Sequence, residues 1–313
     1  MNGTIEVYDK KTDGILYRPT LPESLNQFTS PLQNLAGVNN KGLEITLGWN
    51  DRVGDISYSV SGNFTYNKNK VTKYKGELVR EWRTDANGNK VWYQNVGTVA
   101  NGSSNLIVEG HEMNEYYMMN PYKGNGSYFN SDGTVNINGG PKDGMIRTEA
   151  DMKWLQAMFD AGYKFYPNQA IGKDKIWYGD MIYADYNGDG IYGNDDDRDF
   201  QGVSWRPKYY FGLQASMTWK GFDLSMNWAG AAGFKIDYYK QTQNSVSVTH
   251  GYGLGYDIAY DHYFFDPENP NDPRTNIYSE TPRLVGYQNS GQASATSSWH
   301  LKNGNYIKLK NLT

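Results

Sequence analysis

Between residues 42 and 66, apolar and polar side chains alternate along the chain, apart from a polar break at residues 51–55. One face collects Leu43, Ile45, Leu47, Trp49, Ile56, Tyr58, Val60, Phe64 and Tyr66. A period of two residues predicts a β-hairpin with one face that is removed from water. Strands of about 9 to 12 residues are long enough to cross a bilayer when they are tilted. A soluble β-sandwich has the same alternation, so the hairpin alone leaves both alternatives open.

Alternation also occurs elsewhere in the chain. Residues 211–228 predict a second hairpin around the turn Lys220-Gly221, and single strands are expected at residues 4–9 and 305–310. Two hairpins and two single strands give about six strands. The pattern therefore indicates an all-β protein.

The predicted connections alternate strictly between long and short. Residues 10–40, 68–203 and 237–303 are long, whereas residues 51–55 and 220–221 are short turns. All short turns would then lie at one rim of a sheet and all long loops at the other, as in outer-membrane barrels. This order favours an antiparallel transmembrane β-barrel wall with long extracellular loops over a soluble sandwich.

The connection at residues 68–203 is too long for an ordinary loop, and it carries structural signals of its own. Asn87-Gly88 is a hairpin turn signal. Thr148, followed three residues later by Asp151, resembles a capping box in front of an apolar stretch, and Gly162 is a natural helix stop. We therefore expect a structured lobe here and not a flexible linker.

Composition narrows the alternatives. The chain has 313 residues, a net charge of −4, a mean hydropathy of −0.75 and no cysteine. Low hydropathy is compatible with a membrane barrel, because only alternate strand residues face lipid. The slightly acidic balance without basic patches argues against nucleic-acid binding. The absence of cysteine excludes a disulfide framework and cysteine zinc sites.

Several segments resemble one known family. They are NNKGLEITL (39–47), SVSGNFTYNKNKV (59–71), DYNGDG (185–190), RPKY (206–209), KGFDL (220–224), WAG (228–230) and, after Trp299, GNYIKLKN (304–311). Together they are similar to the C-terminal part of the barrel in the SusC-like (SusC/RagA) TonB-dependent outer-membrane transporters. The matching segments span almost the whole chain.

The resemblance implies a location and partners. Members of this family are plugged barrels of about 22 strands in the outer membrane of Gram-negative bacteria. They import oligosaccharides or peptides together with a SusD-like lipoprotein, powered by the TonB complex. The chain contains no plug domain and no TonB box, and six strands are fewer than the roughly 8 of the smallest bacterial barrels. We therefore expect residues 1–313 to be a barrel fragment that contacts outer-membrane lipid, with TonB contacts made through a missing N-terminal part.

One acidic segment has the spacing of an EF-hand calcium loop, with oxygen ligands at positions 1, 3, 5, 7 and 12. The expected ligands are Asp185, Asn187, Asp189, the carbonyl of Ile191, and Asp196. Gly190 occupies position 6, where the loop turns sharply. Because Asp197 immediately follows Asp196 and precedes Arg198, as in the usual Asp-Arg ending of the family, the choice between Asp196 and Asp197 stays open. The alternative is a solvated acidic turn whose side chains accept hydrogen bonds from backbone amides.

The sequence contains no recognisable catalytic constellation. His111-Glu112 lacks the second histidine of a zinc-protease helix, and there is no nucleophile elbow and no phosphate-binding loop. We therefore predict a protein that is not an enzyme. The alternative of a different class is a secreted β-sandwich glycosidase or carbohydrate-binding module with a structural calcium loop, which would rest on paired carboxylates.

Aromatic side chains in the long loops are candidates for substrate contact, because flat apolar rings beside amide donors suit sugar rings. These residues are Trp92, Tyr93, Tyr116, Tyr117, Tyr122, Tyr252, Tyr256 and Tyr260. The same residues could equally form loop cores or partner interfaces. No feature of the sequence names the substrate.

Overall fold

The computed structural model describes residues 1–17, 32–238, 245–246, 256–286 and 295–313. The chain forms two compact units. Unit 1 comprises residues 1–116, 201–236 and 303–313, and unit 2 comprises residues 117–200 and 237–302. Both units are thus assembled from segments that are distant in sequence. In the part of the chain described, no helix is long and apolar enough to span a membrane.

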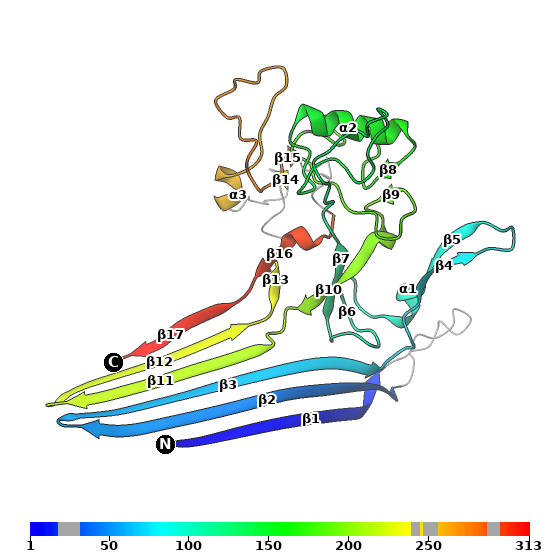
Figure 1. Cartoon of the computed structure of the whole chain (residues 1–313). Coiled ribbons are helices and arrows are strands. Elements are labelled where there is room, and N and C mark those ends of the chain that lie inside the picture. Colours follow the sequence, from blue (N-terminus) through cyan, green and yellow to red (C-terminus); the bar gives the residue numbers. More distant parts are fainter. Residues whose placement is uncertain (18–31, 239–244, 247–255, 287–294) are drawn as a thin grey trace. The chain divides into compact units, whose positions relative to one another are not determined.

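Unit 1 is built on a six-stranded antiparallel sheet with the order β1-β2-β3-β11-β12-β17 (Figure 1). The strands are β1 (Asn2–Tyr17), β2 (Gln33–Val53), β3 (Ile56–Lys73), β11 (Tyr209–Trp219), β12 (Phe222–Ala232) and β17 (Tyr306–Leu312). Both predicted hairpins and the number of six strands are confirmed. The two tight turns contain Gly54 and Gly221 at φ of +58° and +85°, a region that glycine enters without the steric penalty of a Cβ atom.

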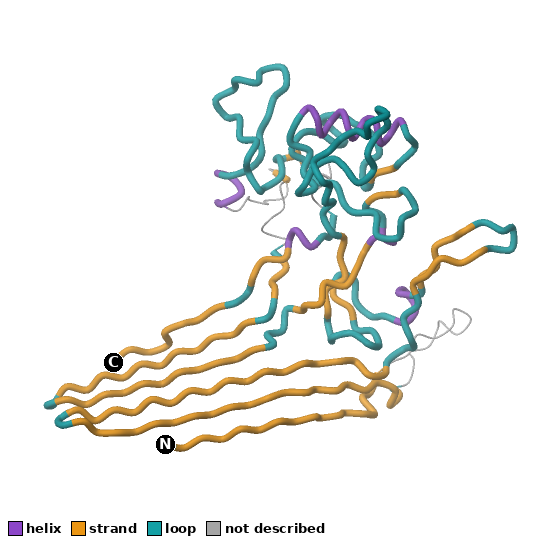
Figure 2. Tube along the Cα trace, in the orientation of Figure 1, coloured by secondary structure: helices purple, strands orange, loops and turns teal. Residues whose placement is uncertain are grey.

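The strand register places the apolar side chains of all six strands on one face. Val7 lies opposite Leu43, Leu43 opposite Tyr66, and Tyr66 opposite Tyr209. Directly opposed residues point to the same side of a sheet. The apolar face comprises Ile5, Val7, Leu43, Ile45, Leu47, Trp49, Ile56, Tyr58, Val60, Phe64, Tyr66, Tyr209, Phe211, Leu213, Met217, Trp219, Phe222, Leu224, Met226, Trp228, Ile307 and Leu309. The two-faced pattern of the first hairpin therefore extends across all six strands, which run side by side in Figure 2.

Much of this apolar face is uncovered. Val7 is 79% exposed, Phe222 72% and Ile5 69%. Among the described residues, the other sheets have only two or three strands, so none matches this sheet as the second layer of a sandwich. The described part of the chain thus lacks the layer that the soluble alternative requires.

The strands reach further than the apolar pattern indicated. β1 continues past residue 9 to Tyr17, and β2 begins at Gln33, so the predicted loop at residues 10–40 is wrong at both ends. β3 likewise continues to Lys73. Many of the added residues are polar, but the antiparallel pairing continues, as between Lys10 and Asn40, because backbone hydrogen bonds do not depend on side-chain type. Pro19, Pro22 and Pro31 lie outside the described residues.

The extended ends of β2 and β3 are covered by a later segment of unit 1. Ala36, Val38 and Val71 are buried there. The amide of Val71 donates to the carbonyl of His111 at 2.8 Å, and the amide of Gly110 donates to the carbonyl of Val71 at 2.9 Å. These backbone hydrogen bonds attach residues 110–111 to the extended end of β3.

The predicted turn at Asn87-Gly88 is confirmed, because it joins β4 (Arg80–Thr84) to β5 (Lys90–Gln94) in a hairpin. Across this hairpin the ring of Trp82 meets that of Trp92 edge-on, with centroids 5.8 Å apart. Unit 1 also contains α1 (Val96–Val99) and β6 (Asn105–Leu106). Four further strands lie at the boundaries between the units: β7 (Glu115–Met119), β10 (Arg198–Ser204), β13 (Lys235–Asp237) and β16 (Leu301–Asn303). The chain passes between the two units within β7, β10, β13 and β16.

Unit 2 contains the predicted helix, α2 (Glu149–Asp160). The capping box is confirmed: the Thr148 hydroxyl accepts from the amide of Asp151 at 3.2 Å, and the Asp151 carboxylate accepts from the amide of Thr148 at 2.8 Å. Gly162 follows the helix end at φ +92°. The helix buries Trp154, Leu155 and Met158 in a core with Ile146, Phe165, Ile176 and Ile182. The other elements of unit 2 are β8 (Lys164–Phe165), β9 (Ile191–Tyr192), η2 (Asp195–Asp197), β14 (Ser245–Val246), α3 (Tyr256–Tyr260), β15 (Val285–Gly286) and η4 (Ser298–His300).

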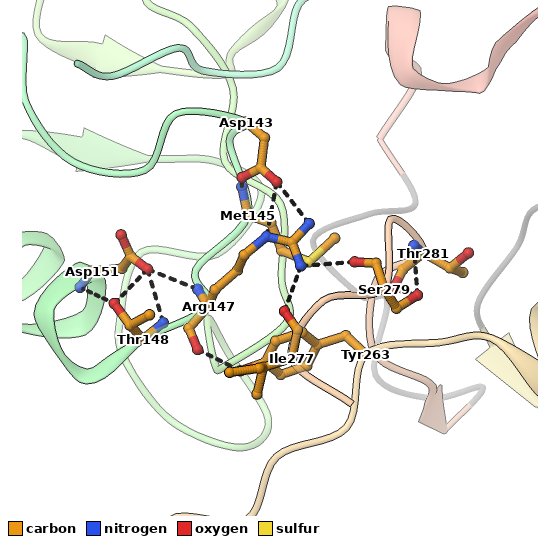
Figure 3. A network of polar contacts seen from close by, with 9 residues as sticks. All are labelled: Asp143, Met145, Arg147, Thr148, Asp151, Tyr263, Ile277, Ser279 and Thr281. Carbon is orange, nitrogen blue, oxygen red and sulfur yellow. Dashed lines mark hydrogen bonds and ion pairs between the residues drawn. The ribbon is translucent and has the colours of Figure 1, made fainter. Parts of the chain in front are cut away.

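Arg147 joins two distant segments within unit 2 (Figure 3). Its Nη1 donates to the carbonyls of Ile277 and Ser279 at 2.8 and 2.7 Å, and its Nη2 forms an ion pair with Asp143 at 2.7 Å. The Tyr263 hydroxyl donates to the carbonyl of Arg147 at 2.6 Å. The two long connections, which the sequence presents as separate loops, therefore fold together into one unit.

Candidate functional site

The acidic segment predicted to bind calcium lies in unit 2, immediately before β9. Asp185 accepts hydrogen bonds from the amides of Gly188, at 2.6 Å, and Gly190, at 2.9 Å. Asn187 accepts from the amide of Asp189 at 3.1 Å. Gly190 has φ +79°, which fits the sharp turn expected at position 6 of the loop. The segment is therefore a compact turn whose conformation is fixed by its own side chains.

Asp197 closes this loop. It is the last residue of η2 and is 1% exposed. Its carboxylate accepts from the amides of Tyr186 and Gly193, each at 2.7 Å, and of Asn194 at 3.1 Å. Burial raises the pKa of Asp197 to about 6, and the negative charge of Asp185 adds to this effect, while the backbone donors oppose it.

The structure distinguishes the two acids that the sequence left open. The amide of Asp196 donates to the Asn194 side chain at 2.8 Å. By contrast, the Asp197 carboxylate accepts hydrogen bonds from the amide of Tyr186 at the start of the loop and from the amide of Gly193 near its end. The negative charge of Asp185 also acts on this carboxylate. Among the predicted positions, Asp185, Asn187, Asp189 and Ile191 form the turn itself, and the geometry favours Asp197 over Asp196 as its closing acid.

The side chains of the acidic loop provide only oxygen atoms as possible ligands for a cation. Among the described residues, no group of three or more histidine, cysteine, aspartate or glutamate side chains is arranged to hold a metal ion. The carboxylates instead accept backbone amides, as in the alternative acidic turn. An ionised carboxylate has about four lone-pair sites, so Asp185 and Asp189 keep accepting capacity beyond these hydrogen bonds. The oxygen-only donor set suits calcium chemically.

A cavity of about 700 Å³ adjoins the acidic loop. Asp185 and Gly190 line one part of it, and Lys123, Tyr163 and Trp299 line others. Ser298 donates to Asn120 at 2.7 Å in the same wall. Aromatic rings together with amide, ammonium and carboxylate groups make this a cavity of the size and composition that bind small molecules.

A second cavity in unit 2, of about 660 Å³, has mainly aromatic walls. Its tryptophan, tyrosine and phenylalanine residues are Trp177, Tyr178, Tyr260, Tyr263, Phe264 and Phe265. The run at residues 263–265 was visible in the sequence, but only the fold shows that it faces Trp177 and Tyr178. Sequence reasoning identified just one of these six, Tyr260.

The cations of this aromatic cavity are largely neutralised. Arg283 donates to both carboxylate oxygens of Asp180, at 3.0 and 2.9 Å, and Arg274 forms an ion pair with Asp272 at 2.8 Å. Burial raises the pKa of the Asp180 carboxyl, and the Arg283 guanidinium opposes this rise. The Arg274 guanidinium lowers the pKa of Asp272 to about 2. Both arginines of the lining are thus engaged by carboxylates of the protein, which makes them less available to an anionic ligand.

The other aromatic residues named from the sequence fall into three groups. Tyr116, Tyr117 and Tyr122 are buried, and Tyr122 also lines the cavity beside the acidic loop. Tyr256 and Tyr260 are 76% and 74% exposed, with ring centroids 4.3 Å apart. Trp92 and Tyr93 lie on the β4–β5 hairpin of unit 1, and Tyr252 lies outside the described residues.

Comparisons with known proteins support the expected resemblance. No family model matches the sequence. TonB-dependent receptor SusC of Bacteroides thetaiotaomicron is 29% identical over 109 residues, which cover 32% of this chain and 11% of SusC. The similarity to SusC-like transporters that the motifs indicated is thus present in sequence over about a third of the chain.

Solved structures match over nearly the full length. The chain is similar to one chain of the RagAB peptide transporter, with a TM-score of 0.56 and 15% identity, over 99% of this chain and 26% of that chain. The RagAB peptide importer in the "open-open" state gives the same TM-score and covers 25% of that chain. The chain therefore spans about a quarter of the RagAB chains that it matches. Its fold is similar to that of a part of the RagAB chains, in agreement with the expected resemblance.

Proposed function

We propose that this chain is part of the barrel domain of a TonB-dependent outer-membrane transporter that imports oligosaccharides or peptides together with a SusD-like lipoprotein. The observation that carries the proposal is the uncovered apolar face, which runs in register across six strands. A soluble protein rarely leaves so large an apolar surface open. Lipid contact accounts for this surface, and transport, not catalysis, is the proposed role.

The dimensions of the apolar face agree with a membrane. Its rows extend from Ile56, opposite Trp219, to Tyr66, opposite Tyr209. Ten residue steps span roughly 34 Å along a strand, and a tilt of about 40° turns this into a height of about 25 Å, the height of the apolar band in outer-membrane barrels. Aromatic residues stand at both ends of the band, as in the girdles of such barrels.

The topology follows from the connections. The turns at Gly54 and Gly221 would face the periplasm, and the long connections that contain unit 2 would face outward. An epitope inserted at Asn87-Gly88 in the full-length protein should be labelled on intact cells. Labelling only after the outer membrane is broken would contradict this orientation.

Unit 2 would supply substrate contacts and the surface for the lipoprotein lid. Its two cavities of about 660 and 700 Å³ have the size of ligand sites. RagAB is described as a peptide transporter, whereas the aromatic and amide-lined cavities suit sugar rings as well as peptide side chains. Co-purification of the full-length protein with a lipoprotein, followed by calorimetry against glycan and peptide panels, would separate these substrates.

Calcium is the proposed structural ion of the acidic loop, with Asp185, Asn187, Asp189, the Ile191 carbonyl and Asp197 or Asp196 as candidate ligands. The register of the turn and the oxygen-only donor set support it. A bound cation would also stabilise the buried carboxylate of Asp197 in its charged form. The ion would stabilise the conformation of residues 185–197 in an extracellular loop.

The principal experiment is to fractionate cells that express the full-length protein. It should be recovered with the outer membrane and should migrate differently on gels with and without boiling, because closed barrels resist detergent until heated. Recovery as a soluble protein without detergent would overturn the proposal and favour the secreted β-sandwich alternative.

A further inference from the structure

Four lysines stand on the apolar face of unit 1 just beyond its last apolar row. Lys41 lies opposite Lys68, and Asn39 lies opposite both Lys11 and Lys70. These positions belong to the same face as Leu43 and Tyr66, because each lies an even number of residues along its strand. We call Lys11, Lys41, Lys68 and Lys70 the outward lysines. They are exposed in the structure.

The outward lysines stand at headgroup height if the apolar face meets lipid, so this inference rests on the proposed function. Lys41 and Lys68 are two residues beyond Leu43 and Tyr66, which is roughly 7 Å along the strand. A residue at that height and on that face points away from the barrel interior. Its ammonium group therefore meets lipid headgroups of the outer leaflet and not the transport lumen.

The charge is specific to this face and to this end of the sheet. At the same height on the opposite face, the Asn69 amide donates to Asn40 at 2.9 Å, and Lys10 is the one cation in these rows of β1, β2 and β3. At the other end of the apolar face, Lys220 pairs with Asp55 at 3.5 Å, and Asp51, opposite Tyr58, adds a negative charge. The cationic excess is thus confined to the outward surface at the long-loop end.

A bound anion would stabilise this arrangement of the outward lysines. Lysines directly opposite each other on neighbouring strands repel, and such like-charge pairs destabilise a sheet. Lys41 is partly neutralised by Asp9 at 3.0 Å, and within the described residues no salt bridge is seen for Lys68 or Lys70. A phosphate between them would turn repulsion into charge-assisted hydrogen bonds.

We propose that the outward lysines bind the phosphate groups of a phosphorylated glycolipid in the outer leaflet. The occupant is a lipid because the same rows continue directly into the apolar face, which would hold its acyl chains. Long lysine stems can lie along apolar surface while their ammonium groups reach the headgroup. Tyr66, stacked on Tyr209 with ring centroids 5.1 Å apart, would lie at the boundary between the acyl chains and the headgroup of this lipid.

The test uses the full-length protein extracted from outer membranes in mild detergent. The variant Lys68→Gln/Lys70→Gln removes two outward charges. Lys10→Gln/Lys308→Gln removes the same charge from exposed strand positions on the opposite face and serves as the control. Phosphorylated glycolipid from the same membranes, its phosphatase-treated form and inorganic phosphate are added separately, and lipid bound per protein is measured by native mass spectrometry.

We expect the outward variant to retain phosphorylated glycolipid at about half the wild-type level or less, since each basic residue near an anionic surface adds to binding. The control should bind as wild type does, the dephosphorylated lipid should bind weakly to all three proteins, and inorganic phosphate should not displace the lipid. Equal binding by the outward variant and the control, with both recovered in the outer membrane, overturns this inference alone. Absence of the protein from the outer membrane overturns the proposed function as well.

Discussion

The two units bury apolar side chains in opposite ways. In unit 2, Trp154, Ile146 and Ile176 are fully buried against other side chains of the same unit. In unit 1, the sheet leaves residues such as Phe222 and Val7 more than 70% exposed on one continuous face. Unit 2 therefore carries its own core, whereas the sheet needs an apolar surrounding that the described chain does not supply. The same residue types thus form a core in one unit and an exposed face in the other, which is the face that the proposed function assigns to lipid.

The core of unit 2 gives the largest expected effect. Trp154→Ala should destabilise unit 2 by about 3 to 5 kcal/mol, because a fully buried ring and its cavity are both lost. It also removes the Nε1 donor to the Asn136 carbonyl at 2.8 Å. Hydrogen exchange of the full-length protein should show lost protection in unit 2 and unchanged protection in β2 and β3. Phe129→Ala, at a residue that is 45% exposed, is the control.

The ion pair of Asp180 tests whether unit 2 also depends on buried charge. Arg283→Gln leaves the fully buried Asp180 carboxylate without its partner, which should cost about 3 to 5 kcal/mol. Arg274→Gln breaks an Arg–Asp pair whose arginine side chain is 71% exposed and should have little effect, because water screens exposed ion pairs. Protease resistance of unit 2 in urea measures both. Similar losses for the two variants would contradict a special role for burial.

The sheet of unit 1 can be tested with a pair of neighbouring residues. Leu213 lies near the middle of β11 on the apolar face, opposite Gly62 and Trp228, and Gln214 points to the other face. Leu213→Lys should destabilise the full-length barrel by about 2 to 4 kcal/mol, because the charge would sit near the bilayer midplane. Gln214→Lys should cost less than about 1 kcal/mol. Unfolding in urea from lipid vesicles measures the difference, and equal effects would argue against lipid contact.

The acidic loop gives a smaller, pH-dependent effect. Because the folded pKa of Asp197 lies near 6, above its ordinary 3.8, the folded loop binds more protons than the unfolded loop between these values. Without a cation, the contribution of Asp197 to loop stability should be highest below about pH 4 and fall by roughly 2 to 3 kcal/mol as the pH rises through 6. Calcium should reverse this fall, and Asp197→Asn should abolish both responses. Proteolysis of residues 163–203 with calcium or chelator provides the measurement, and identical digestion in both would favour the acidic turn.

The sheet could be predicted because its information is local. Alternation at residues 43–49 and 56–66 set the faces, and the turns at Gly54 and Gly221 set the hairpins. The ends of the strands could not be predicted, since Lys10 and Lys11 pair through backbone groups that leave no mark on the apolar pattern. The capping box at Thr148 was readable for the same local reason.

The candidate sites were only partly readable. Asp185, Asn187 and Asp189 are close in sequence, so their spacing predicted the turn that the structure contains. Which acid closes the loop could not be predicted from this spacing, because the position of η2 decides whether the side chain of Asp196 or of Asp197 is buried. The aromatic cavity joins Trp177 to Phe265, and no local pattern connects residues so far apart.

Sequence alone thus determined the six strands of the sheet apart from their ends, their two faces, the tight turns and the acidic loop, because each is set by side chains within a few residues of one another. Only the tertiary structure decided that residues 117–200 and 237–302 form one unit, held by Arg147 on the carbonyls of Ile277 and Ser279. It also decided that Lys41 meets Lys68 across neighbouring strands. Such contacts depend on how distant segments pair, and a linear pattern carries no record of that pairing.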